Sequence, residues 1–136
     1  MSSFKQLTKI INVKNTRLEN ILTCYTGSDW IPLANSVRLY HKKMIIPKEI
    51  IIDEDEYFRL RLLYWNQNSE QNIHCHPEYQ SIGSKVLSGH LIERIYTPTI
   101  YQRSLTSING ITCLNGEDYH DMKALNDSVT LNIDIK

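Results

Sequence analysis

Two histidines two residues apart, His74 and His76, lie between two apolar runs of the sequence. Side chains two positions apart on a β-strand point to the same face, so the two imidazoles would project together and Cys75 would face the opposite way. A third histidine, His120, opens another strand-like run near the end of the chain. Neutral imidazole suits iron, zinc, copper and nickel. The three histidines therefore predict a transition-metal site inside a barrel; two solvated loop histidines are the alternative.

The N-terminal part of the chain differs in pattern from the part that carries the histidines. Apolar residues repeat at helical spacing only within residues 4–26. A capping box at residues 16–19 predicts a break in the helix and a second helix from Thr16, which Gly27 would end. Residues 1–35 are therefore predicted to form a helical cap.

From residue 36 the apolar residues alternate as they do in strands, and turn signals such as Asn109-Gly110 separate the runs. Many short strands without intervening helices indicate a sandwich or a barrel. The sequence thus predicts one domain, residues 1–136, of the all-β class, with an antiparallel β-barrel at 36–136. The predicted strands are 37–46, 49–52, 57–65, 73–76, 82–87, 90–96, 100–105, 110–114, 119–125 and 128–135.

Composition excludes several classes of partner. Lysine plus arginine and aspartate plus glutamate both number 15, so the net charge is zero and a nucleic-acid-binding surface is not expected. The cysteines, Cys24, Cys75 and Cys113, show no CxxC spacing, which is typical of reduced thiols in a cytoplasmic protein. No apolar run approaches the roughly 20 residues that span a bilayer. We expect a cytoplasmic monomer or homodimer that binds neither nucleic acid nor membrane.

The last predicted strand alternates cleanly between apolar and polar residues. Its polar face carries Thr130, Asn132 and Asp134, and its apolar residues lie between them. If the barrel interior holds a metal, this polar face would line the cavity. The alternative is an ordinary strand whose polar residues face water.

The order of these motifs resembles the cupin superfamily, and more closely its cysteine dioxygenase (thiol dioxygenase) branch. That fold is the cupin, or RmlC-like, jelly-roll β-barrel. The resemblance extends from about residue 28 to the end of the chain and keeps the order of its segments. It is carried by Asp29-Trp30 with residues 40–46, by 58–65, by 73–76 with 85–93, by 111–115 with Tyr119-His120, and by 128–133.

The resemblance implies an iron(II) site held by His74, His76 and His120. Members of the branch bind cysteine through its thiolate and amine and use O₂ to oxidise the sulfur to a sulfinate. Three neutral ligands leave the ion its full charge and open positions, which suits this chemistry. The resemblance thus predicts an oxidoreductase that acts on L-cysteine or a related small thiol.

The residues around the predicted iron depart from the family pattern. The carboxylate-binding arginine of the family falls on Lys43, or on Lys42 if the register slips by one. The family's outer-sphere histidine falls on Asn132 and its active-site tyrosine near Asp134, so these two are the candidate catalytic positions. The family's crosslinking cysteine falls near Ser81, so the crosslink is absent.

Two further interpretations stay open. Arg59 and Arg61 share a face of their predicted strand and would line the cavity in place of Lys43, unless that face is outward and solvated. Glu78 would be a fourth ligand if the loop turned it inward, and the site would then accept manganese, nickel or zinc. The alternative functions are a metal-binding cupin of another class, such as an isomerase or small-ligand sensor, and a cupin that has lost catalysis.

Overall fold

The computed structural model describes residues 3–12, 17–40, 43–96 and 99–136. Within these residues three helices precede nine strands. The helices are α1 (Phe4–Ile11), α2 (Leu18–Cys24) and α3 (Trp30–Tyr40). The strands are β1 (Lys48–Glu54), β2 (Phe58–Trp65), β3 (Glu70–His74), β4 (Ser81–Ser88), β5 (His90–Ile95), β6 (Tyr101–Thr106), β7 (Ile111–Asn115), β8 (His120–Ala124) and β9 (Ser128–Ile135).

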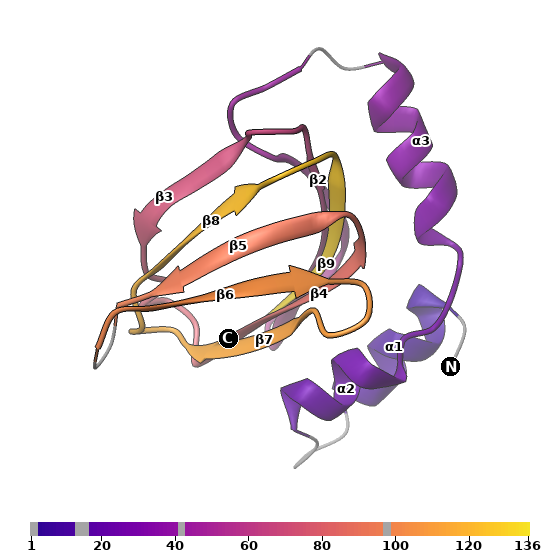
Figure 1. Cartoon of the computed structure of the whole chain (residues 1–136). Helices are drawn as coiled ribbons and strands as arrows, with labels where there is room; N and C mark the ends of the chain where they lie inside the picture. Colours follow the sequence, from indigo (N-terminus) through magenta and orange to yellow (C-terminus); the bar gives the residue numbers. More distant parts are fainter. Residues whose placement is uncertain (1–2, 13–16, 41–42, 97–98) are drawn as a thin grey trace.

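The strands form two antiparallel sheets. One has five strands in the order β1-β2-β9-β4-β7, and the other has four in the order β3-β8-β5-β6. Strands adjacent in the sequence are therefore divided between the sheets, as in a jelly roll. Figure 1 shows the three helices together along one side of the barrel, with the four-stranded sheet turned away from them. The prediction of an all-β jelly-roll barrel behind N-terminal helices is confirmed.

The five-stranded sheet is buried on both faces. On β2, Leu60 and Leu62 belong to the core that the helices cover, whereas Leu63 and Trp65 belong to a second apolar cluster. The same division holds on β9, where Leu131 packs in the helix-covered core. Because successive side chains alternate, the polar residues of these strands point into the barrel with the second cluster.

Helix α2 packs closely on β4 and β7. A side chain on Gly83 of β4 would meet Leu18 and Leu22 of α2 at about 2.8 Å, so the absent Cβ permits this approach. Leu22 is fully buried there. The helical cap thus replaces water on the outer face of the sheet, so the polar residues of β9 have no solvated face to occupy.

The predicted strand at 37–46 is wrong. Residues up to Tyr40 belong to α3, and 43–47 form an irregular segment before β1. Ala34 and Val37 lie three residues apart and are both buried in the core, so the helical pattern continues past the predicted boundary at residue 35. The apolar residues Met44 to Ile46, which suggested a strand, are exposed.

Other element boundaries also differ from the sequence prediction. Helix α2 begins at Leu18 with Arg17 as its N-cap, and the predicted cap Thr16 lies outside the described residues. This helix ends at Cys24, before Gly27 is reached. Strand β3 ends at His74, so His76 lies beyond the strand on which it was predicted.

Candidate metal centre

The three predicted histidines lie together. Their nearest ring nitrogens are all within 4.8 Å of one another. The ring centroids of His74 and His120 are 4.6 Å apart, and those of His74 and His76 are 4.7 Å apart. His74 and His120 face each other as a cross-strand pair of β3 and β8. The structure therefore brings together residues from two adjacent strands and from the turn that follows β3.

A β-bulge turns His74 toward the cluster. Gln71 pairs with Met122 and His74 pairs with His120, so three steps along β3 match two steps along β8. Without the extra residue, Ile73 would face His120 and His74 would point outward. The Nδ1 atom of His74 contacts the Asn72 carbonyl oxygen within the bulge at 2.5 Å. A proton on Nδ1 leaves Nε2 as the free acceptor.

His76 is held by a turn, not by strand alternation. Its backbone N–H donates to the Gly116 carbonyl at 2.7 Å, and the Tyr79 N–H donates to the His76 carbonyl at 3.0 Å. Gly116 in turn donates its N–H to Gln80. A Cβ on Gly116 would overlap the carbonyl oxygens of His76 and Tyr79. The β7–β8 connection thus clamps the turn that carries the second histidine.

His120 is oriented by a carboxylate that sequence analysis did not single out. Its Nδ1 lies 2.9 Å from Oε2 of Glu93, and its Nε2 is buried without a hydrogen-bond partner among the described residues. Glu93 is fully buried; its Oε1 accepts hydrogen bonds from Thr112 at 2.7 Å and from Nε of Arg103 at 2.9 Å. The sequence did contain one indication of this role: Glu93 is a charged residue at an inward position of β5, between the buried Leu91 and Ile95.

Burial keeps two of the imidazoles neutral. Desolvation lowers the pKa of His74, and desolvation together with the neighbouring His74 lowers the pKa of His76 to about 4. Although burial alone would raise the pKa of Glu93, hydrogen bonds from His120 and Thr112 bring it below its usual value. Neutral imidazoles offer the lone pairs that metal binding requires.

The donor set fits a metal ion. A metal about 2.1 Å from each nitrogen would set those nitrogens roughly 3.0–3.4 Å apart, so the rings must close by on the order of 1.5 Å from their widest separation. Rotation of the imidazole side chains would have to supply this movement. The unpartnered Nε2 of His120 is the observation that favours a ligand, because buried polar atoms are nearly always satisfied. The three-histidine group can therefore hold a metal ion.

Two arginines lie beside this cluster inside the barrel. Asp134 accepts from Arg59 at 2.9 Å and from Arg61 at 3.1 Å, and Arg61 also contacts Glu49 at 3.2 Å. The guanidinium of Arg59 stacks 5.1 Å from the ring centre of Tyr79. Arg61 is only 7% exposed, and its Nε is buried without a partner among the described residues. The interpretation of outward, solvated arginines is wrong.

The polar face of β9 points into the barrel, so the alternative that it faces water is wrong. The Asn132 amide donates to Ser84 Oγ at 2.6 Å and its carbonyl accepts from Thr130 at 2.8 Å. Thr130 also accepts from the Trp65 indole at 3.1 Å. Asp134 is buried between the two arginines. The catalytic role of Asn132 and Asp134 stays a prediction.

The structure does not bring Lys43 to the cluster. Lys43 is exposed in the irregular segment before β1, not on a barrel strand, and Lys42 lies outside the described residues. The neighbouring Ile45 carbonyl accepts from Glu70 N–H at the start of β3, whereas His74 ends that strand. Four residues of strand separate Glu70 from His74, so the two ends of β3 lie about 13 Å apart. The segment that carries Lys43 is at the end remote from the histidines.

Glu78 and Cys75 also stay outside the group of possible ligands. Glu78 is exposed, and Cys75 is half-buried near the Tyr119 side chain. The prediction that Cys75 points away from the histidines agrees with its absence from this group, but the strand alternation given as the reason is wrong because β3 ends at His74.

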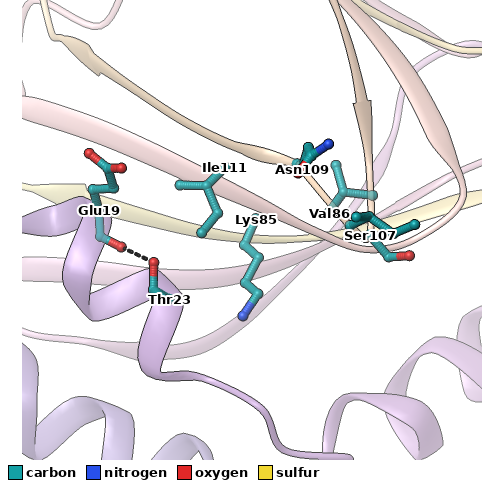
Figure 2. A pocket seen from close by; sticks show the side chains of 9 residues that line it. Glu19, Thr23, Lys85, Val86, Ser107, Asn109 and Ile111 are labelled. Carbon is teal, nitrogen blue, oxygen red and sulfur yellow. Dashed lines mark hydrogen bonds between the residues drawn. The ribbon is translucent and has the colours of Figure 1, made fainter.

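A pocket of about 360 Å³ lies outside the barrel, between α2, β4 and the β6–β7 connection. Figure 2 shows Glu19 and Thr23 of α2 on one side of it and Ser107 and Asn109 on the other. The Lys85 ammonium donates to the carbonyl oxygens of Leu22 and Tyr25, so it ties β4 to the end of α2. This pocket contains none of the three histidines.

Solved structures share this architecture. A cupin superfamily protein from Desulfitobacterium hafniense has a TM-score of 0.62 at 10% identity, over 76% of this chain and 87% of that one. The fold is that of a cupin. A cupin-2 domain protein from Shewanella frigidimarina has a TM-score of 0.58 at 13% identity, over 76% of this chain and 92% of its own. KdgF from Halomonas sp. has a TM-score of 0.60 at 12% identity, over 70% and 83%.

These likenesses concern the cupin fold alone, and none of these structures points specifically to a cysteine dioxygenase. No family model and no curated protein matches the sequence. Among the described residues, no helix has the length and apolar character needed to cross a membrane.

Proposed function

We propose that the protein is an iron(II)-dependent thiol dioxygenase that oxidises L-cysteine or a related small thiol to a sulfinate. The observation that carries the proposal is a cluster of three histidines that includes no carboxylate. Bound iron(II) would supply a dipositive charge that lowers the pKa of a thiol, and open positions for two substrates. The overall reaction adds both atoms of O₂ to one thiol, R–SH + O₂ → R–SO₂H, and needs no further reductant.

The chain's own residues supply orientation and exclusion of water. Glu93 and the Asn72 carbonyl direct two of the imidazoles, so these two rings are oriented before any ion binds, although the three nitrogens are not yet at the separation that a bound metal requires. The buried Arg61 Nε, with no partner among the described residues, is the group that would donate a hydrogen bond to a substrate carboxylate in place of Lys43. Asp134 would hold both guanidiniums in place for that contact.

The test is iron-loaded protein with L-cysteine under air, in which O₂ consumption and the sulfinate product are measured together. We expect one sulfinate formed for each O₂ consumed and none with His120→Ala. Cysteamine, which lacks the carboxylate, should react more slowly because it cannot engage Arg61. O₂ consumption without sulfinate would contradict the proposed reaction.

A metal-dependent cupin of another class, such as an isomerase or a small-ligand sensor, is the second candidate. It is favoured by Asn132 and Asp134, which replace the histidine and tyrosine that the resemblance expects and are both engaged with other side chains. A protein that binds one metal per chain yet leaves every thiol of a panel unoxidised under air would support it. Zinc, nickel and manganese are then the alternative metals.

A further inference from the structure

A single buried carboxylate connects the candidate metal centre to the opposite edge of its sheet. Glu93 pairs directly across the strands with Arg103 of β6, and His120 lies on β8, on the other side of β5. One oxygen of Glu93 faces His120 Nδ1, and the other accepts from both Thr112 and Arg103. Glu93 is 0% exposed, whereas about one third of the Arg103 side chain is exposed.

We propose that Glu93 is the positioning residue of the metal centre, which holds His120 with Nδ1 protonated and Nε2 directed at the other two histidines. Arg103 and Thr112 hold Glu93 itself in the required conformation. The proposal deepens the proposed function and rests on the three-histidine metal site.

The contact acts on both the tautomer and the direction of the ring. A free imidazole carries its proton on either nitrogen and turns about its Cβ–Cγ bond. An anionic acceptor 2.9 Å from Nδ1 favours the proton there, because a charge-assisted hydrogen bond is about twice as strong as a neutral one. Nε2 then keeps its lone pair and faces the cluster, where it has no hydrogen-bond partner among the described residues.

The three histidines differ in how they are held. The ring of His74 contacts a backbone carbonyl, and no described residue forms a hydrogen bond with the ring of His76. His120 alone of the three contacts an ionised side chain. The orienting partner of His120 can therefore be removed by substitution. Carboxylate partners of this kind also raise the basicity of a ligating imidazole.

A purely structural ion pair between Glu93 and Arg103 is the competing explanation. The Glu93→Gln variant distinguishes the positioning role from a purely structural ion pair, because it keeps the size of the side chain and removes its charge. Glu54→Gln is the matched control, since Glu54 forms an ion pair of the same length, 2.9 Å, with Lys136 at the surface. A structural pair alone would lower stability and leave the His120 tautomer and the metal affinity unchanged.

The first measurement is the dissociation constant for Co²⁺ and Zn²⁺ by chelator competition, without thiol. We expect Glu93→Gln to bind about 10–100-fold more weakly, which is the usual effect of losing such a partner, and Glu54→Gln to match the wild type. The second is ¹⁵N NMR of the metal-free protein. His120 should be the Nδ1–H tautomer in the wild type and a mixture in Glu93→Gln.

A folded Glu93→Gln variant with wild-type metal affinity and the wild-type tautomer would overturn the positioning role and leave the proposed function standing. If the wild type binds no metal, the proposed function fails, and the NMR result still decides the role of Glu93. Should Glu93→Gln fail to fold, Thr112→Val removes one donor to the carboxylate and keeps its charge. A threefold or larger loss of metal affinity supports the proposal, and an unchanged affinity overturns it.

Discussion

Replacement of Asp134 by alanine removes the carboxylate that joins Arg59 and Arg61 inside the barrel. Asp134 is 1% exposed, and it contacts the two guanidiniums at 2.9 and 3.1 Å. Among the described residues, Arg61 would then keep only Glu49 as an ionic partner, at the edge strand β1. Removing one partner of a buried ion pair costs about 3–5 kcal/mol, because the remaining charge stays desolvated.

The lower end of that range applies here, since Arg59 is one-fifth exposed and can regain water. A loss of about 3 kcal/mol in a chain of this length corresponds to a fall in Tm of roughly 10 °C. Thermal unfolding followed by circular dichroism measures it. Glu54→Ala, which removes an exposed ion pair with Lys136, is the control and should change Tm little. An Asp134→Ala variant that melts within about 2 °C of the wild type would refute the buried network.

Four further changes have defined outcomes. His120→Ala should remove most bound metal, measured by elemental analysis, while His90→Ala, a half-buried histidine outside the cluster, should bind it normally. Gly116→Ala should destabilise the chain by about 1–3 kcal/mol in urea and weaken metal binding, because its Cβ displaces the His76 turn; Gly116→Ala with wild-type stability would contradict this clamp. Lys43→Ala should leave the KM for L-cysteine unchanged, because Lys43 is exposed in a loop; a tenfold rise in KM would show that Lys43 takes part in substrate binding. Lowering the pH should destabilise the metal-free protein: between pH 6.5 and about 4 the unfolded chain protonates His76 and the folded chain does not, so the unfolded state binds more protons. Urea titrations of the wild type should show this slope, and His76→Gln should reduce it, with the part that His74 contributes remaining.

The sequence predicted the class of fold and the three histidines because both depend on local pattern. Alternating apolar residues between turn signals are enough to predict a barrel, and the position of His120 at the start of a late strand-like run marked it as the third candidate, in agreement with the resemblance. The strand at 37–46 was mispredicted because β-branched and aromatic residues follow Asn35, although burial of Val37 on a helix outweighs that local preference.

The geometry of the site depends on features that have no local signal. Strand alternation was the predicted reason for His74 and His76 to converge, but a bulge and a clamped turn produce the convergence. The partner of a bulge lies on another strand, so β3 alone cannot reveal it. Glu93 was missed for the same reason, since its partners come from β6, β7 and β8.

The interior of the barrel divides into an apolar end and a charged end, and this division explains where stability comes from. Along β2 the inward residues change from Arg59 and Arg61 to Leu63 and Trp65, and the latter two belong to the apolar cluster that fills one end. Buried ion pairs contribute little net stability, because desolvation offsets their attraction. The apolar cluster and the helix-covered core must therefore supply most of the stability of the fold. Apolar substitutions at the arginines and Asp134 together would be expected to raise stability.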